Sequence, residues 1–494
     1  MQKHSTILRI ARAGNPARAL RLFRGQGLDQ HKDDPKLLTL NGRLLKDHAR
    51  LATVPERHDL YQKALAAYLA AFECERDTYP LINAASLAMF AGDAEQSRTH
   101  AQQTLDMLNA DPDEGETPYW REATRAEALL LLGNHAQAKT ALSAGIAKQP
   151  LAHEDLAATI GQFERIIAAQ HGDAKWLDGY RPPASIHFSG LIGLDPNAFG
   201  LHEAIDEAIA ALRPGYAFGA LAAGADIMIA EAAVAAGAQL HVTLPMAIGE
   251  FRKTSVEPFG ENWTARFDAL LNQAAQVDVL ADYLLPDTCP FALRIELASL
   301  ISMGQCLRQS FVLRSQSHAL TIAAPGEAER PHIEKWLSAN RSMMRIETPR
   351  LGKNPNSAEN QLDMQLIGLA FAVGCELTTL TSIAQDYGAR VIVHPDGCLF
   401  NVPLENCLNF ARKCLQAFPT CDIGMAITVT DNSAPMRSVI EMVELLAKTA
   451  EPGQLHVDRM TAFVAKTLDQ EIKTEEIGEI PSLYGAISLW QARF

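Results

Sequence analysis

Apolar and polar positions follow two different periods along this chain, and the change between them falls near residue 185. Before about residue 170, apolar residues recur every three or four positions, which predicts amphipathic helices with one buried face. One stripe at helical spacing consists of Tyr61, Leu65, Tyr68 and Phe72. We interpret this stripe as core between packed helices, and a peptide-binding groove is the alternative.

Three short turn signatures divide the helical part. They are Ala13-Gly14-Asn15, Ala91-Gly92-Asp93 and Leu132-Gly133-Asn134, each between two amphipathic stretches. Glycine can end one helix and Asn or Asp can cap the next, so each signature predicts a helical hairpin. Their irregular spacing indicates degenerate tetratricopeptide-type repeats. We therefore predict an all-α helical-repeat domain over residues 1–172.

After a Pro/Gly-rich linker, apolar runs alternate with helical stretches, which predicts a parallel sheet with helices on both faces. The expected strands cover residues 185–192, 216–221, 239–244, 277–281, 319–323 and 342–348. The expected helices cover residues 202–212, 225–236, 262–275, 291–307 and 328–340. We predict a Rossmann-like α/β domain over residues 181–350.

Residues 216–245 are the most informative segment of this domain. A strand closes on Gly219, a small-residue turn ends at Gly224, and a helix follows directly. Glycines at such a turn let a ligand approach the main chain, and unpaired N–H groups at a helix N-terminus attract anions. We predict a ligand site here, together with Ser189 and Gly190 at the end of the preceding strand.

Asp226, in the first turn of that helix, has two interpretations. Its carboxylate favours the helix dipole but repels a phosphate, so it either binds a ribose hydroxyl or simply stabilises the helix. Beyond Pro245, we interpret the loop as a lid in which Arg252, Ser255 and Arg266 cover a bound anion. The alternative is that these side chains belong to solvated surface.

Residues 361–494 predict a third unit of α/β or α+β type. A β-hairpin turns at Pro395-Asp396-Gly397, and an amphipathic helix, a strand and a further helix follow. A Gly/Asn/Pro-containing linker at residues 352–360 separates this unit from the one before.

The composition of the chain argues against several classes of partner and site. The net charge of −14 argues against a nucleic-acid partner, and no apolar run reaches the ~18 residues that a membrane span needs. None of the eight cysteines forms a CxxC pair, so we expect neither a zinc ribbon nor a disulfide framework, and a reducing cytoplasm fits. We interpret four of them as buried small hydrophobes, Cys398, Cys407, Cys414 and Cys421.

Three segments resemble known families. LNGRLLKDHARL, KALAAYLAAFE and TYPLINAASLAMFAGD resemble the tetratricopeptide-like TRAF-binding region of apoptosis-signal-regulating kinases over about residues 35–180. FSGLIG, GALAAGADIMIAEAA and AGAQLHVTLP resemble the SLOG superfamily over about residues 181–350. The first resemblance implies a docking module for a protein partner, and the second implies a pocket for a nucleotide or nucleotide-derived ligand.

ARVIVHPDGCLFNV and the segments after it resemble a class III nucleotidyl cyclase homology domain, a ferredoxin-like α+β fold, over about residues 362–494. Such cyclases hold two metal ions with two carboxylates. Asp396 matches one of these, but Val373 stands where the resemblance places the other. Glu441 and Leu445 replace the transition-state Asn and Arg. We therefore expect a pseudo-cyclase without a metal site.

The SLOG-like part also lacks the glycine turn that its phosphoribohydrolase members use before their catalytic Glu. Glu296 is the acid in the corresponding segment, but the sequence provides it with no positioning partners. We expect a multidomain, non-catalytic cytoplasmic sensor with a nucleotide-like ligand, a protein partner and pairing of the cyclase-like domains into a homodimer. A nucleotide or N-glycosidic hydrolase, a weak cyclase, and a scaffold with an empty pocket remain the alternatives.

Overall fold

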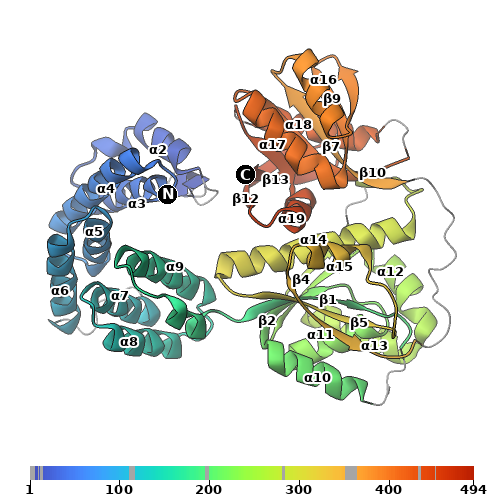
Figure 1. The fold of residues 1–494 in the computed structure, drawn as a ribbon, viewed down its shortest axis with the longest axis horizontal. Coiled ribbons are helices and arrows are strands. Elements are labelled where there is room, and N and C mark those ends of the chain that lie inside the picture. Colours follow the sequence, from blue (N-terminus) through green and yellow to red (C-terminus); the bar gives the residue numbers. More distant parts are fainter. Residues whose placement is uncertain are drawn as a thin grey trace. The chain divides into compact units, whose positions relative to one another are not determined.

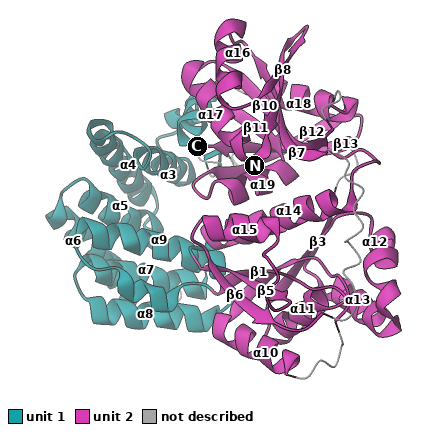
Figure 2. Cartoon of the chain, turned by 45° about the vertical axis from the view of Figure 1, so that its right-hand side comes forward, with its two compact units in different colours: residues 1–182, 312–314 teal, residues 183–311, 315–494 magenta. Residues whose placement is uncertain are grey.

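The structure is a computed structural model in which the chain forms two compact units. One unit contains residues 1–182 and 312–314, and the other contains residues 183–311 and 315–494 (Figure 2). Among the residues that the structure describes, no helix is long and apolar enough to cross a membrane. The described residues are 6–8, 10–11, 15–110, 117–194, 200–280, 284–350, 364–431, 435–450 and 452–494.

The first unit is helical, and consecutive helices from α2 to α8 pack against each other, whereas α9 packs against α5 and α7 (Figure 1). Its helices are α2 (Pro16–Gly25), α3 (Pro35–Ala49), α4 (Val54–Cys74), α5 (Thr78–Phe90), α6 (Ala94–Ala110), α7 (Pro118–Leu131), α8 (His135–Lys148) and α9 (His153–Ala169).

Local sequence explains where these helices begin and end. The side chains of Asn15, Asp34, Asp77 and Thr117 each accept a hydrogen bond from a backbone N–H in the first turn of a helix. Gly92 and Gly133 adopt positive φ (84° and 82°) between α5 and α6 and between α7 and α8. Two of the three predicted hairpin turns are therefore confirmed, whereas Ala13 and Gly14 lie outside the described residues.

The aromatic stripe of α4 belongs to the core of this unit. Tyr68 and Phe72 are buried, and Tyr61 and Leu65 pack against the same cluster half-buried. The interpretation as inter-helix core is confirmed.

The second unit contains a six-stranded parallel sheet with the strand order β4-β3-β2-β1-β5-β6. Its strands are β1 (Ala184–Gly190), β2 (Pro214–Gly219), β3 (Gln239–Leu244), β4 (Gln276–Val279), β5 (Ser317–Ala323) and β6 (Ser342–Glu347). Its helices are α10 (Leu201–Leu212), α11 (Ala225–Ala235), α12 (Ile248–Ser255), α13 (Glu261–Gln273), α14 (Phe291–Leu313) and α15 (Pro331–Ser338).

The order of these strands creates a switch point beside β1. From β1 the chain builds β2, β3 and β4 on one side and then returns to place β5 and β6 on the other. Crevices open at such points, outside the carboxyl ends of the strands. The predicted parallel sheet is confirmed, and the strands lie close to the ranges expected from the apolar runs.

The second unit also contains a seven-stranded mixed sheet with the order β12-β13-β11-β10-β7-β9-β8, in which only β10 and β11 pair in parallel among the described strands. Its strands are β7 (Gln365–Val373), β8 (Arg390–His394), β9 (Gly397–Pro403), β10 (Asp422–Thr430), β11 (Leu455–Asp458), β12 (Lys473–Ser482) and β13 (Gly485–Arg493). Its helices are α16 (Leu377–Asp386), α17 (Cys407–Ala417), α18 (Arg437–Thr449) and α19 (Arg459–Leu468).

Helix α14 is shared by the two sheets of this unit. Leu297, Leu300 and Ile301 belong to the core of the mixed sheet, whereas Phe291 packs against the core of the parallel sheet. A helix that is covered on two sides needs apolar residues around most of its circumference. The two sheets therefore form one compact unit, and the predicted boundaries at residues 172, 181, 350 and 361 stay predictions.

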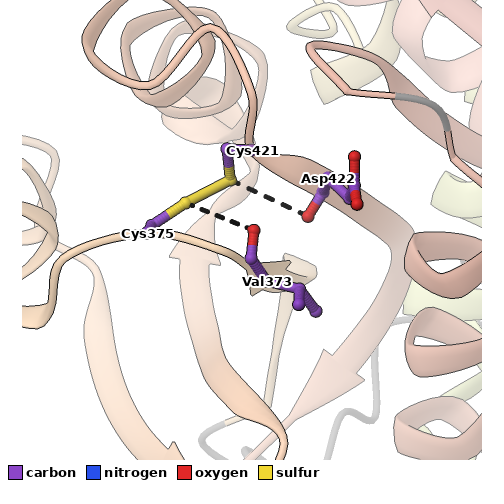
Figure 3. Close-up of a disulfide and its surroundings, with 4 residues drawn as sticks. All are labelled: Val373, Cys375, Cys421 and Asp422. Carbon is purple, nitrogen blue, oxygen red and sulfur yellow. Dashed lines mark hydrogen bonds between the residues drawn. A yellow bond between two sulfur atoms is a disulfide. The ribbon is translucent and has the colours of Figure 1, made fainter.

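One cysteine pair differs from the expectation. Cys375 follows β7, Cys421 precedes β10, and a disulfide joins them (Figure 3). The two strands are antiparallel neighbours with Val373 opposite Asp422, so the strand ends bring these cysteines together. The absence of a CxxC pair could not exclude this bond, because the two cysteines are 46 residues apart. Cys421 is buried as expected, but it is not a free thiol.

Candidate functional site

A cavity lies where β1, β2 and β3 end and α14 passes over them. The space between its walls, counted together with the solvent at its mouth, is about 650 Å³. Its apolar wall consists of Phe188, Ile192, Ala220, Ala222, Pro245, Phe251, Phe291, Ile295 and Ala298. Its polar lining consists of His187, Ser189, Asp226, Thr243, Ser255, Ser299, Ser302 and Arg330, and Gly190 completes it.

Four of the eight predicted ligand-binding residues line this cavity. They are Ser189, Gly190, Asp226 and Ser255. The other four, Gly219, Gly224, Arg252 and Arg266, are not part of its lining. The structure thus brings half of the predicted set together around one space, and the binding role of every member stays a prediction.

The glycines are explained by packing within the fold. A Cβ on Gly219 would lie 2.4 Å from the ring of Phe188, and one on Gly190 would lie 2.4 Å from the Cβ of Ala225. Gly224 has a φ of +124°, and a Cβ there would lie 2.6 Å from the carbonyl oxygen of Leu191. The protein's own atoms therefore fill the approach that we expected a ligand to use at Gly219 and Gly224.

Three main-chain amides of the turn also have hydrogen-bond acceptors within the protein. The Ala222 N–H donates to Oδ2 of Asp226 over 3.2 Å, and the N–H groups of Ala223 and Ala225 donate to backbone carbonyls. The amides of Ala222, Ala223 and Ala225 are therefore engaged by acceptors of the protein itself, and anion binding at this turn stays a prediction.

The two lid arginines are held by acidic side chains. Arg252 pairs with Glu257 at 3.4 Å and with Asp268 at 3.1 Å. Arg266 donates from Nε and Nη2 to Glu231 over 2.8 and 2.5 Å and lies over the ring of Trp263. Both guanidinium groups are neutralised by α11–α13 and their loops, away from the cavity.

The cavity is lined by a different cationic side chain, Arg330, which was not among the predicted site residues. Arg330 precedes α15, and its Nη2 donates to the Gly190 carbonyl over 2.6 Å. The sequence could have indicated this residue, because Arg330 follows the fifth predicted strand and the carboxyl ends of parallel strands meet at one edge of the sheet. Four of its five N–H groups are not used by this bond, so it can bind an anionic ligand group.

Asp226 is the electrostatic centre of the cavity. Its side chain is only 8% exposed, and its Oδ1 makes no hydrogen bond of standard geometry. Burial raises the pKa of this carboxyl from 3.8 to about 6, although Arg330 and the N–H groups of Ala222 and Gly190 favour the charged form. A buried acceptor with a free oxygen can receive a hydrogen bond from a ligand hydroxyl or amino group.

Two serine–histidine pairs lie on the α14 side of β1. Ser189 Oγ is 3.4 Å from Nε2 of His332, whose Nδ1 is 3.5 Å from Oε2 of Glu296. Ser302 Oγ is 3.2 Å from Nδ1 of His187. Glu296 therefore has a partner that the sequence did not reveal, since His332 lies 36 residues further along the chain.

A chain of polar contacts leads from the cavity to the mixed sheet. Thr243 donates to Gln305 over 2.9 Å, and Gln305 donates to the buried Asp278 over 2.6 Å. Asp278 also pairs with Arg459 at the start of α19, with Nη1 to Oδ1 at 2.9 Å. The wall of the cavity is thus continuous with the interface between the two sheets of this unit.

The hairpin of β8 and β9 carries one carboxylate at its tip. Asp396 lies in the turn between β8 and β9, and a Cβ on Gly397 would lie 2.5 Å from the Ala372 carbonyl, so the tip abuts the end of β7 next to Val373. Lys448 lies 3.7 Å from the Asp396 carboxylate. Glu441 is engaged by Arg437 and Tyr484. The described residues contain no cluster of three metal-binding side chains.

Comparisons with known proteins support the N-terminal assignment. A family model described as Tetratricopeptide Repeats-Sensor matches residues 2–88. The chain therefore begins with tetratricopeptide-like repeats similar to those of a sensor family. No curated protein matches the chain.

Solved structures give distant likenesses. An adenylate/guanylate cyclase/hydrolase from Silicibacter pomeroyi is 15% identical, over 26% of this chain and 96% of that chain, with a TM-score of 0.22. The catalytic core of a rhodopsin-guanylyl cyclase is 10% identical, over 26% and 97%, with a TM-score of 0.22. An O-GlcNAc transferase from Thermobaculum terrenum is 12% identical, over 64% and 61%, with a TM-score of 0.20. Likenesses this distant carry no argument about the chain.

Proposed function

We propose that this chain is a sensor protein. In this proposal its parallel-sheet part, similar to the SLOG superfamily, binds a nucleotide-derived small molecule. Its tetratricopeptide-like repeats dock a protein partner, as helical repeats of this type do with their extended surfaces.

The observation that carries the proposal is the presence of Asp226 and Arg330 at one cavity. The free Oδ1 of Asp226 accepts a hydrogen bond from a hydroxyl or amino group, while the guanidinium of Arg330 binds a phosphate or carboxylate. A nucleotide-derived molecule carries both kinds of group, since its ribose offers hydroxyls and its phosphates offer anionic oxygens. The apolar wall is suited to a base or another planar ring.

The route from the cavity to the rest of the unit supports a sensor. Helix α14 contributes Ile295, Ser299 and Ser302 to the cavity wall and Leu297 and Leu300 to the core of the mixed sheet. A ligand that shifts α14 by a small amount must also alter the packing of the mixed sheet, because both cores are close-packed. We therefore propose that the cyclase-like part receives the signal and supplies no chemistry of its own.

A thermal-shift screen tests ligand binding. The full chain is heated with ATP, GTP, NAD, ADP-ribose or cyclic nucleotides, and a binding ligand raises the melting temperature by mass action. We expect stabilisation by at least one of these compounds at millimolar concentration. If none of these compounds stabilises the chain, the sensor proposal fails and the alternative of a scaffold with an empty pocket is favoured.

The enzyme alternatives are tested on the same samples. Chromatography after overnight incubation separates intact nucleotides from released bases, ribose phosphates and cyclic products. We expect the nucleotides to remain intact. Released base would favour the N-glycosidic hydrolase, and a cyclic product would favour the weak cyclase.

A further inference from the structure

Ser189, His332 and Glu296 form a hydrogen-bonding series that no part of the proposed sensor mechanism uses. The serine hydroxyl faces one imidazole nitrogen at 3.4 Å, and the carboxylate faces the other at 3.5 Å. The three residues come from three elements, the end of β1, the first turn of α15 and the first turns of α14. A serine, a histidine base and an acid that orients the histidine are the three parts of an activated nucleophile.

The position of each group suits this chemistry. Ser189 lines the cavity, whereas His332 is 1% exposed and is reached from the cavity through the serine. Burial lowers the pKa of His332 below 6.5, so the imidazole is neutral at pH 7 and can accept a proton. The two contacts are longer than the 2.6–3.2 Å of an engaged catalytic pair, as is common before a substrate is bound.

A second serine–histidine pair in the same cavity provides an internal comparison. Ser302 lies 3.2 Å from His187, and both residues line the cavity. The charged groups that influence His187 include His332 but no carboxylate among the described residues. A histidine without an oriented acid is a poor general base. Ser302 is therefore a matched control for Ser189.

We propose that Ser189 is a nucleophile that hydrolyses small carboxylic esters in this cavity. Ser189 Oγ forms a bond to the acyl carbon while its proton passes to Nε2 of His332, and Glu296 stabilises the resulting imidazolium. The ester C–O bond breaks, and the leaving alkoxide takes the proton from His332. Water then attacks the acyl-enzyme, gives a proton to His332, and releases the carboxylic acid as Ser189 recovers its hydrogen.

Arg330 and the apolar wall define the substrate class. The Arg330 guanidinium donates to the carbonyl of Gly190, the residue next to Ser189, so its positive charge lies close to the oxyanion that forms on the acyl carbonyl. Phe188, Ile192 and Phe251 leave room for a short, apolar acyl group. The substrate is therefore an ester of a short-chain acid.

This inference shares its cavity with the proposed sensor but does not depend on nucleotide binding. A fluorophosphonate probe tests it directly, because an activated serine attacks phosphorus and expels fluoride without any nucleotide. The full chain is incubated with the probe, and intact-mass and peptide-mapping mass spectrometry locate the adduct. We expect one adduct on Ser189, none in Ser189→Ala, and an adduct that is still on Ser189 in Ser302→Ala. No adduct on the wild-type chain, or an adduct on Ser302, would overturn the proposal.

Two further variants test the roles of His332 and Glu296. We expect His332→Gln to reduce the labelling rate constant by roughly 10²-fold or more, since a general base contributes about that factor. Far-UV circular dichroism checks that each variant is folded. If His332→Gln does not fold, the labelling rate of Glu296→Gln tests the proposal instead. If Glu296→Gln is labelled as fast as the wild type, the proposal that Glu296 and His332 activate Ser189 is refuted.

A pH profile separates positioning by Glu296 from a merely structural role. Glu296 raises the pKa of His332, so Glu296→Gln should move the midpoint of the labelling profile to lower pH. Arg330, Lys335 and His187 also act on this imidazole and are identical in the two proteins. Asp226 titrates in the same cavity and is likewise unchanged. An unmoved midpoint would contradict the assignment of Glu296.

Discussion

Replacing Asp226 by Asn should make the protein more stable at alkaline pH. The folded protein holds this carboxyl with a pKa of about 6 instead of 3.8, because burial disfavours its charged form. Above pH 6 the folded state therefore bears the cost of a charged, poorly hydrated carboxylate. Asn keeps an oxygen that can accept the Ala222 N–H and carries no charge.

The magnitude follows from the difference between the two pKa values. A difference of roughly two pKa units at ~1.4 kcal/mol each corresponds to about 3 kcal/mol at pH 8. A raised carboxyl pKa leaves stability intact at low pH and removes it as the pH rises through the interval from 3.8 to about 6. The advantage of Asp226→Asn should accordingly fall to about half at pH 5 and vanish below pH 3.8.

Thermal or urea unfolding at pH 5 and pH 8 measures this difference. For a unit of about 300 residues, 3 kcal/mol corresponds to an increase in melting temperature of roughly 4 °C at pH 8. Asp206→Asn on α10 is the control, because that side chain is exposed and should change the melting temperature by less than about 1 °C. Equal or lower stability of Asp226→Asn at pH 8 would refute the reasoning, and so would a gain that does not shrink at pH 5.

Three further outcomes are expected. Gly219→Ala should lower the free energy of unfolding by about 1–3 kcal/mol in urea unfolding, since the ring of Phe188 fills the space for its Cβ, and unchanged stability would contradict this packing. Arg459→Met should lower the free energy of unfolding by about 1–3 kcal/mol, because it leaves the carboxylate of the buried Asp278 with amide donors only. Urea unfolding measures this loss, and an unchanged free energy of unfolding would show that the pair does not hold the two sheets together. Alkylation under non-reducing conditions should leave Cys375 and Cys421 joined in one disulfide-linked peptide pair, whereas separate alkylated peptides would disprove the bond.

The regular elements could be predicted because their patterns are local. Strands β1, β2, β3 and β5 are buried on both faces of the sheet, so each appears in the sequence as a nearly continuous apolar segment. The helix that follows Gly224 begins where the small-residue turn ends, as expected. The extent of α14 was underestimated by six residues at its C-terminus. This last part of the helix meets the mixed sheet through a charged residue, because Arg308 pairs with Glu475 at 3.1 Å.

The site could be predicted only in part because its members meet through topology. Ser189 and Asp226 lie near recognisable strand ends, but Arg330 and His332 lie at the start of α15, about 140 residues after β1. Only the return of the chain to β5, next to β1, brings them together. The role of Asp226 was left open because sequence does not reveal burial, and burial decides its pKa.

The most direct test of the central claim is calorimetric titration of the full chain and of Asp226→Asn at pH 7.5. ADP-ribose, NAD, ATP, GTP and cyclic nucleotides are titrated into each protein. We predict that at least one of them binds the wild type with a Kd of about 100 μM or below, and that the variant binds it at least ~10-fold more weakly, as expected for a lost hydrogen bond to a charged group. No measurable binding to the wild type, or equal affinity of the two proteins, would contradict the account.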